Sequence, residues 1–473
     1  MKTKSVPLSF DEAVQHMDTM LHLPGNFGYI KREIRICGMA AVVYLAEGLH
    51  DSEAAARVIE ACMYTDTVPQ SAEDFAKAHL PYGEEETTTD PKTAFLGCAT
   101  GCLLLLCAAY PGTFFLVKCR NIPMRPLNEP EHDKVLRGNH VGFGETLPRN
   151  CALLRRQLPN PSLVMKSIRI GTFSETAVVM SYMQGVADMR YVLAIEKRLS
   201  EISCEALSLG MQSLAECLIK VRVWNPFPRF RYTERPDAAA ASLCEGSILI
   251  MCDNSPQAMV LPVSIFSFLQ ETNDFYMPPF TGTYLRLVRF GTFLLSIYLL
   301  PIWYALVFHT RALPPWLDFI RFSEPATVPV LFQLLLIELA IDGLKIASMN
   351  TPNALANSLS VIGGLILGEF AVNVGWFQPE CILYMSVVGI AHFAQNNYEL
   401  GYALKYVRVA MLIFVALLGW WGVLLGSALF VFLLATTPTI NGTRSYFYPL
   451  IPFDGRALFS LFFRRRKQKP SGS

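Results

Sequence analysis

This chain has few charged residues and no excess of either sign. Only 17% of its 473 residues are charged, and the formal net charge is +1. No basic field therefore covers the chain, which argues against nucleic acid as a partner. Hydrophobic residues make up 52% of the sequence, and this combination is typical of a membrane protein.

The sequence also lacks the motifs of common enzymes and metal sites. In GNHVGFGET (138–146) the glycines follow the pattern G-x-x-x-G-x-G, which is neither a dinucleotide-binding pattern nor a P-loop. Neither G-x-S-x-G nor HExxH occurs. Cys98, Cys102 and Cys107 are spaced CxxxC and CxxxxC, which does not favour zinc. We therefore predict a protein that is not an enzyme and that uses no cofactor or metal.

The N-terminal stretch MKTKSVPLSFDEAVQHMD has no apolar core of the signal-peptide type. We therefore expect the first domain to remain in the cytoplasm. Eleven of the twelve cysteines precede residue 285. In a reducing compartment we expect them to be buried thiols, not disulfides.

The first 285 residues alternate between strand and helix patterns. They predict two small α/β units in tandem, at 1–125 and 135–285, joined by a connector (120–133) with three prolines. Asp51 or Ser52 is expected to cap the first helix. We predict one strand segment at 33–48, paired strands at 102–119, 162–183 and 246–263, and helices at 51–63 and 189–202.

Long apolar runs dominate from Phe290 onward. A membrane-spanning helix needs about 20 apolar residues to cross roughly 30 Å of hydrocarbon. We predict an all-α polytopic membrane domain of about six helices at 286–440, followed by a basic cytosolic tail at 441–473. The expected spans are 290–308, 326–349, 355–377, 381–395, 400–418 and 423–437.

The distribution of basic residues indicates how the chain is oriented. Arg444, Arg456 and RRRKQK (464–469) favour a cytoplasmic C-terminus, and Arg286 with Arg289 favours a cytoplasmic N-terminal region. If both ends of the chain lie on the cytoplasmic side, the number of membrane crossings must be even. Six crossings satisfy this condition, whereas five would place the basic tail outside.

The apolar stretch LLIELAIDGLK (335–345) contains Glu338, Asp342 and Lys345. At about 100° per residue, all three lie on one narrow helix face. Opposite charges at this spacing can pair, and paired charges cost less in or near lipid. This intramembrane charge cluster is therefore either a structural ion pair between helices or part of an ion path.

A second stripe of interest lies in the segment 355–377. Ile362, Leu365, Glu369 and Asn373 fall on one helix face, with polar and apolar residues along it. Pore linings combine polar rings with apolar constrictions. The stripe is a candidate ion path, and the alternative is an amphipathic helix packed inside a bundle.

A long motif resembles a known family. NPFPRFRYTERPDAAAASLCEGSILIMCDNSPQAMVLPVSIF (225–266) looks like the signature of the A subunits of GerA-type spore germinant receptors. The resemblance continues in LGEFAVNVG (367–375), NNYELGYALKYVR (396–408) and YFYPLIPFD (446–454). Nutrient-receptor A subunits tend to carry a neutral residue where this chain has Glu369, so the branch of stage V sporulation protein AF is the most similar.

The resemblance implies a role in germination at the inner membrane of bacterial endospores. Family A subunits are thought to form a homo-oligomeric ring, with five copies expected, that conducts cations. Their partners would be other membrane proteins of the germination machinery. Two other functions stay open from the residues: a secondary transporter or solute-permeation subunit, and a non-conducting scaffold whose membrane charges are structural.

The segment RYTERPD (231–237) within the motif also has a direct interpretation. We expect Pro236 to prevent a helix from running through it, so that one segment ends there and a strand begins. The charged side chains are placed to pair, either as a structural corner of the second α/β unit or as a subunit contact in a ring. The residues concerned are Arg231, Glu234, Arg235, Pro236 and Asp237.

Overall fold

The structure is a computed structural model of the whole chain, which divides into two compact units. We call Met1–Lys220, Phe230–Val263 and Thr439–Thr443 the sheet unit, and Val221–Arg229, Ser264–Pro438 and Arg444–Ser473 the helical unit. The residues described are 8–80, 85–119, 140–219, 224–271, 274, 276–310, 313–323, 325–350, 363–364, 369–395, 397–437 and 446–463.

The sheet unit contains two five-stranded antiparallel sheets, ordered β1-β2-β4-β5-β3 and β6-β7-β9-β10-β8. The first is built from β1 (Tyr29–Ile36), β2 (Met39–Ala46), β3 (Glu85–Thr88), β4 (Leu103–Cys107) and β5 (Phe114–Val117). The second is built from β6 (Leu163–Ile170), β7 (Thr176–Met183), β8 (Arg231–Thr233), β9 (Ile248–Cys252) and β10 (Ala258–Leu261).

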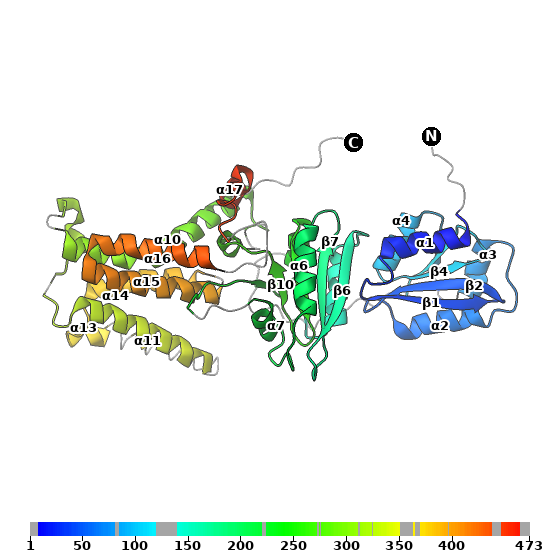
Figure 1. Ribbon diagram of the computed structural model, residues 1–473, viewed down its shortest axis with the longest axis horizontal. Coiled ribbons are helices and arrows are strands. Elements are labelled where there is room, and N and C mark those ends of the chain that lie inside the picture. The colour runs from blue at the N-terminus through cyan, green and yellow to red at the C-terminus, as the bar shows by residue number, and fades with distance from the viewer. Residues whose placement is uncertain are drawn as a thin grey trace. The chain divides into compact units, whose positions relative to one another are not determined.

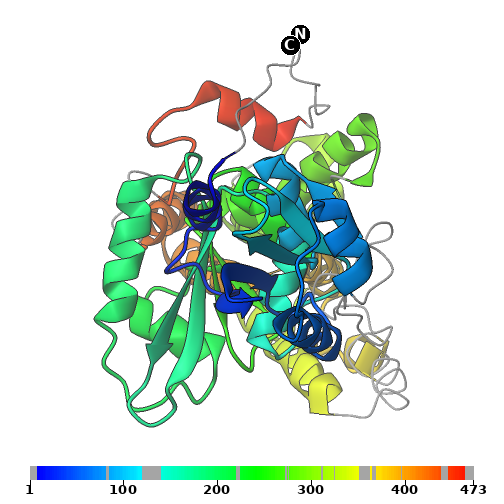
Figure 2. The ribbon, with the colours of Figure 1, turned by 90° about the vertical axis from the view of Figure 1, so that its right-hand side faces the viewer.

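The two sheets are versions of one topology. Each half of the unit runs helix, two strands, two helices, strand, helix, two strands (Figures 1 and 2). The helices are α1 (Phe10–Leu21), α2 (Ser52–Met63), α3 (Ala72–His79) and α4 (Pro91–Ala99), and then α5 (Leu147–Gln157), α6 (Met189–Ser200), α7 (Met211–Leu218) and α8 (Pro236–Cys244). This internal repeat was not predicted from the sequence.

Helices cover both faces of each sheet. Side chains of α2 and α3 pack on one face of the first sheet, and those of α1 and α4 on the other. The second sheet is covered in the same way by α6 with α7 and by α5 with α8. Coverage on both faces explains why β4, β5, β9 and β10 are apolar and buried at every position.

The predicted elements are largely confirmed, with one difference. The paired strands at 102–119, 162–183 and 246–263 and the helices at 51–63 and 189–202 are present, and Asp51 caps α2. The segment 33–48 is a hairpin, not one strand, because the chain reverses at Cys37 and Gly38. Both residues have positive φ, 48° and 79°, which a two-residue hairpin turn requires. The connector 120–133 lies outside the described residues.

Backbone hydrogen bonds join the two halves of the sheet unit. The Phe27 amide donates to the Met165 carbonyl (2.6 Å), and the Met165 amide donates to Oδ1 of Asn26 (2.8 Å). The Arg155 guanidinium is buried above the Tyr29 ring, 4.2 Å from its centroid, and donates to the carbonyls of Phe27 and Gly28. The segment before β1 therefore pairs with the edge strand β6 of the second sheet.

The helical unit contains the apolar helices. They are α10 (Pro279–His309), α11 (Val330–Asn350), α13 (Ala371–Asn373), α14 (Pro379–Phe393), α15 (Tyr398–Leu418), α16 (Trp420–Thr436) and α17 (Gly455–Phe462). Two short 3-10 helices, η1 (Ile265–Leu269) and η2 (Pro315–Ile320), belong to the same unit. The helices α15 and α16 meet at Gly419, whose φ of 61° favours glycine.

Two of these helices, α10 and α15, are long and apolar enough to cross a membrane, and α14 and α16 are shorter apolar helices. The 21 residues of α11 include three ionisable side chains. The predicted third span, 355–377, lies mostly outside the described residues. The number of crossings, the orientation and the domain boundaries at 125, 135, 285 and 440 therefore stay predictions.

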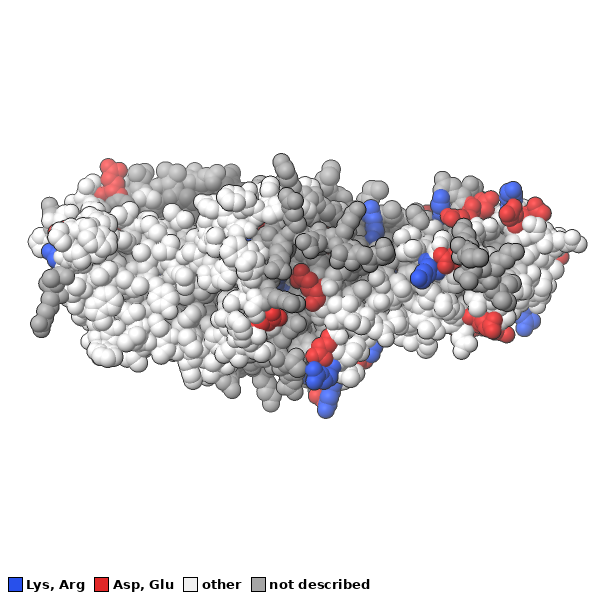
Figure 3. Space-filling view, turned by 90° about the horizontal axis from the view of Figure 1, so that it is seen from above, with Lys and Arg blue, Asp and Glu red and all other residues white. Residues whose placement is uncertain are grey.

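Charged side chains are unevenly distributed between the units. On the face shown in Figure 3 they gather over the part that holds the sheets, whereas the described surface of the helices is almost free of them. The few charges inside the helical unit therefore need separate explanations.

Candidate functional site

Two carboxylates of α11 face two cations of α15. Nη2 of Arg408 lies 2.6 Å from Oε1 of Glu338, and Nζ of Lys405 lies 3.5 Å from the same oxygen. Lys405 also pairs with Asp342. The acids are four residues apart and the cations three, so each helix presents both of its charges on one face. We call these four residues the charge cluster.

The charge cluster is largely buried and also reaches α10. Lys405 and Arg408 are 7% and 2% exposed, and Nη1 of Arg408 donates to the Ser296 carbonyl of α10 at 2.6 Å. An isolated charge in this apolar environment would carry a large desolvation cost, which pairing and hydrogen bonding offset. The cluster therefore joins three helices.

The structure corrects the predicted role of Lys345. Its ammonium does not pair with Asp342, because α15 supplies that carboxylate with Lys405. Lys345 instead points at aromatic rings, with Nζ 4.5 Å from the Tyr398 centroid and 4.6 Å from that of Tyr402. This cation–π contact stabilises an ammonium that has no carboxylate partner among the described residues.

The sequence contains one signal for the partners of the two carboxylates. Lys405 and Arg408 are three residues apart in an apolar helix, a spacing that matches the acids on α11. Our prediction from the sequence did not connect these cations with Glu338. Spacing within one helix cannot show which other helix lies opposite.

The candidate pore stripe is only partly described. Ile362 and Leu365 lie outside the described residues, while Glu369 and Asn373 are both exposed. None of the cations in the described part of the chain forms a salt bridge with Glu369. Glu369 and Asn373 are one helical turn apart in sequence, in the segment that ends with α13.

The structure corrects the prediction for RYTERPD (231–237), because a helix and not a strand begins there. Pro236 is the first residue of α8, not the start of a strand, because proline is favoured at that position of a helix. The strand β8 comes before it. Arg235 is fully buried and forms a two-pronged pair with Asp237, with Nε–Oδ1 at 3.0 Å and Nη2–Oδ2 at 2.7 Å. Glu234 accepts a hydrogen bond from the Gln257 side chain (3.2 Å), and Arg231 belongs to β8.

The internal repeat contains this corner twice. Oγ1 of Thr233 accepts from the Arg235 amide at 3.2 Å, just before Pro236. In the first half, Oγ1 of Thr88 accepts from the Asp90 amide at 3.1 Å, just before Pro91, the first residue of α4. The recurrence supports a structural role for the turn, while the Arg235–Asp237 pair is specific to the second half.

Sequence reasoning missed Asn225, which lies in the quoted signature. Its side chain is buried and donates to the Leu433 carbonyl (2.8 Å) and to Oγ1 of Thr437 (3.1 Å), at the end of α16. Its Oδ1 accepts from the Phe227 amide at 3.1 Å. Asn225 thus satisfies polar groups at a helix C-terminus.

Tyr446 also holds this segment. Its hydroxyl donates to the Pro228 carbonyl at 2.7 Å. Burial raises the pKa of Tyr446 well above its usual value, so the phenol remains a proton donor. We call residues 224–229, which contact α16 and Tyr446, the strap.

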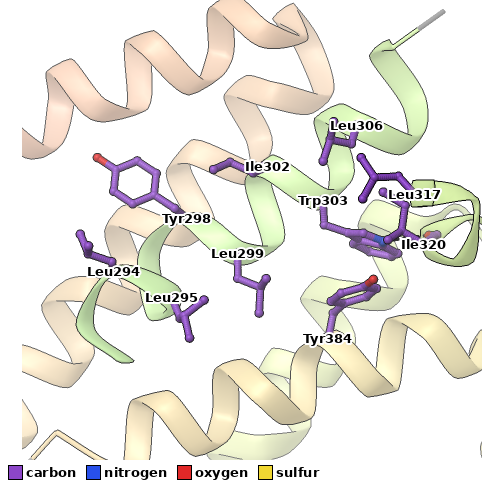
Figure 4. Close-up of a pocket in the computed structure, with 10 residues that line it drawn as sticks. All are labelled: Leu294, Leu295, Tyr298, Leu299, Ile302, Trp303, Leu306, Leu317, Ile320 and Tyr384. Atoms are coloured by element: carbon purple, nitrogen blue, oxygen red, sulfur yellow. Dashed lines mark hydrogen bonds between the residues drawn. The ribbon is translucent and has the colours of Figure 1, made fainter. Parts of the chain in front are cut away.

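An apolar cavity of about 300 Å³ lies beside α10 (Figure 4). The rings of Trp303 and of Tyr384 on α14 lie side by side in its lining, 4.5 Å apart between centroids, and Nε1 of Trp303 donates to the Ile320 carbonyl at 3.1 Å. No lining residue is charged, so the cavity does not offer an ion path. It is lined by Leu294, Leu295, Tyr298, Leu299, Ile302, Trp303, Leu306, Leu317, Ile320 and Tyr384.

The described residues show neither a metal site nor a reactive thiol. They contain no group of three or more histidine, cysteine or acidic side chains that could hold a metal ion. All twelve cysteines are free thiols. Burial raises the pKa of both Cys98 and Cys151 to about 12, so neither is a reactive thiolate at neutral pH.

A repeated α/β region combined with two helices long and apolar enough to cross a membrane fits a membrane-associated protein. The chain belongs to the Bacillus/Clostridium GerA spore germination protein family, whose sequence model matches residues 15–471. The family predicted from the signature motif is thereby confirmed.

Individual relatives agree with this assignment. The chain is 35% identical over 356 residues to stage V sporulation protein AF of Bacillus subtilis (strain 168), covering 75% of this chain and 72% of the relative. It is 30% identical over 304 residues to spore germination protein A1 of the same strain, covering 64% and 63%.

A solved structure is also similar in part. It is the crystal structure of the N-terminal domain of the A subunit of the Bacillus megaterium spore germinant receptor GerK3. The match covers 56% of this chain and all of that domain, with a TM-score of 0.42 and 23% sequence identity.

Proposed function

We propose that this chain is a membrane subunit of the spore germination machinery, and that its copies form a ring of five around a cation-conducting pore. Family membership supports the setting. The observation that carries the pore is Glu369, an exposed carboxylate in an otherwise uncharged segment.

The contrast with the charge cluster supports this assignment. Glu338 and Asp342 face Lys405 and Arg408, so their charges serve to hold helices together. Glu369 has no such partner among the described residues, and its exposed side chain is available to water or to ions. Intramembrane carboxylates normally face a protein interior or a water-filled path.

The proposed mechanism follows from a ring of such carboxylates. Glu369 from each copy would attract cations and repel anions, and Asn373 would extend the polar lining by one turn. Leu365 and Ile362, one and two turns earlier on the same stripe, would form an apolar constriction that stops conduction when it is dry. Widening the ring would let water and ions enter.

The proposal includes a location and partners. We place the protein in the inner membrane of the bacterial endospore, with both termini on the cytoplasmic side. Its partners would be further copies of itself and other membrane proteins of the germination machinery. The sheet unit would then lie in the cytoplasm.

Cysteine accessibility in membranes tests the pore assignment. Glu369→Cys and Asn373→Cys would be made in a chain whose exposed Cys37, Cys217 and Cys244 are replaced by serine. Water-borne thiol reagents should modify both positions and block ion flux. Native Cys381, which is fully buried, is the internal control and should stay unmodified. Unreactive positions 369 and 373 in a conducting protein would exclude this stripe as the pore.

A further inference from the structure

We propose that the apolar cavity beside α10 binds the end of one acyl chain of a membrane lipid. The inference rests on the side chains that line the cavity, on its length and cross-section, and on the difference between its two ends. It requires that the helical unit lies in a membrane, but it does not depend on ion conduction.

The wall of the cavity selects an uncharged, apolar ligand. Of the ten lining residues, seven are leucine or isoleucine and three are aromatic. The one indole N–H among them, on Trp303, already donates to the Ile320 carbonyl. An apolar cavity of about 150 Å³ stays dry and takes up benzene, and ligand pockets in proteins begin at about 300 Å³. A cavity of about 300 Å³ with this wall therefore suits a hydrocarbon, not water or an ion.

The cavity is elongated along α10. The lining residues of that helix run from Leu294 to Leu306 at alternating steps of one and three residues, so they lie along one face (Figure 4). The helix rises about 18 Å between these two leucines. A volume of about 300 Å³ spread over that length gives a mean cross-section of about 17 Å².

These dimensions fit a single hydrocarbon chain. Because carbon atoms in contact lie about 4 Å apart, one extended chain has a cross-section of about 13 Å². A helix of a second copy does not fit, since a cylinder about 10 Å across occupies roughly 1,400 Å³ over the same length. A partner helix could cover the opening of the cavity but could not fill it.

The two ends of the cavity differ in exposure. Leu294 and Leu295 are 44% and 42% exposed, whereas Trp303 and Ile320 are 3% and 6% exposed. Within the described part of the chain, the cavity thus opens at the two leucines and is closed around Trp303. The opening lies on a helix long and apolar enough to cross a membrane, where lipid chains can reach it. The bound chain therefore enters beside Leu294 and places its methyl end near the Trp303 ring.

Photolabelling of the full-length protein in lipid nanodiscs tests the proposal. The probe is phosphatidylcholine with a diazirine either at the methyl end of one acyl chain or next to its ester group. Peptide mass analysis after irradiation locates the label. We expect the methyl-end probe to label Trp303 and Ile320 at least fivefold more than the ester-end probe does, although both residues are shielded from the surrounding lipid.

Leu417 of α15 is the internal control for contact with the surrounding lipid. It is 75% exposed and lies in the second helix that is long and apolar enough to cross a membrane. Label on Leu417 without label on Trp303 and Ile320 would overturn the proposal and leave the membrane location intact. Absence of label at all three residues would contradict both.

A substitution that fills the cavity provides the second test. Leu299→Trp introduces a larger side chain into the lining and should lower the labelling of Ile320 at least fivefold. Leu424→Trp, at a leucine of α16 that is 61% exposed, is the matched control and should have no effect. Labelling that Leu299→Trp leaves unchanged, or that is lost when several copies share one disc, would overturn the proposal. If Leu299→Trp does not fold, the comparison of the two probes on the natural sequence decides.

Discussion

Glu338 and Glu369 are both glutamates in apolar segments, and their neighbours give them different roles. Glu338 lies within 2.6 Å of Arg408 and 3.5 Å of Lys405, whereas Glu369 is exposed. The same residue type therefore serves as a structural link in α11 and, in our proposal, as a cation-attracting group near α13.

The charge cluster leads to the first prediction. Glu338→Gln should lower the free energy of unfolding by about 3 kcal/mol, because it leaves buried cations without their counter-charge. Lys345→Met should cost only about 1 kcal/mol, because it removes a cation–π contact and no ion pair. Unfolding of the two purified variants in detergent micelles gives the comparison. A larger cost for Lys345→Met would contradict the observed pairing.

Thiol reactivity gives a second prediction at this scale. With a pKa of about 12, Cys98 and Cys151 are thiolate in only about one molecule in ten thousand at pH 8. Alkylation followed by peptide mass analysis should modify the exposed Cys37, Cys217 and Cys244 first. The buried pair should react only as the pH approaches 12 or the protein unfolds. Rapid modification of Cys98 in folded protein at pH 8 would show that its surroundings are more open.

Individual residues were predictable only where local spacing decides their environment. The sequence placed Glu338, Asp342 and Lys345 on one face, yet it could not show that α15 supplies Lys405 and Arg408 to that face. The Arg235–Asp237 pair was foreseen as a pairing of neighbours. The helix α8 that begins at Pro236 was not predicted, because proline can either end a helix or begin one.

At the scale of elements, α16 is held at its C-terminal end by the strap. Trp224 stacks on Phe432 with the rings 5.9 Å apart, and the Phe227 ring lies 5.9 Å from that of Phe430. Asn225 lies between these two contacts and binds the last turn of the helix. The strap continues directly into Phe230, where the chain re-enters the sheet unit.

The strap gives the third prediction. Asn225→Ala should lower the free energy of unfolding of the full chain by about 1–3 kcal/mol, because the Phe227 amide loses its acceptor and the Leu433 carbonyl and the Thr437 hydroxyl each lose a donor. Asn160→Ala removes one exposed hydrogen bond and should change stability by less than about 0.5 kcal/mol. The two variants are compared by thermal unfolding. Equal stabilities would mean that Asn225 does not hold α16.

Elements with a clear period or a strong turn signal were predicted well. The Asp51 cap and the paired strands at 102–119 appear where the sequence indicates them. The hairpin at Cys37-Gly38 was missed because β2, the strand after the turn, is apolar throughout. The internal repeat was missed because burial on both faces makes the central strands of either sheet uniformly apolar. The hydrophobic pattern of such strands does not reveal that the two sheets share one strand order.

At the scale of the whole molecule, we expect a closed ring of copies. Crosslinking of the full-length protein in membranes should give a ladder that ends at five copies. Asn225→Ala, which weakens the strap but leaves the stripe intact, should keep that ladder. A species that stays monomeric in membranes and in mild detergent would argue against the ring.

The most direct test is the current carried by purified protein in a planar bilayer with a KCl gradient. We expect a cation-selective reversal potential for the natural sequence, and a shift toward zero for Glu369→Gln in protein of unchanged stability. Glu338→Gln, in contrast, should lower the number of active channels through instability and leave selectivity in the remaining ones unaltered. No conductance from correctly assembled protein, or a reversal potential that Glu369→Gln does not change, would contradict the assignment of Glu369 to a cation pore.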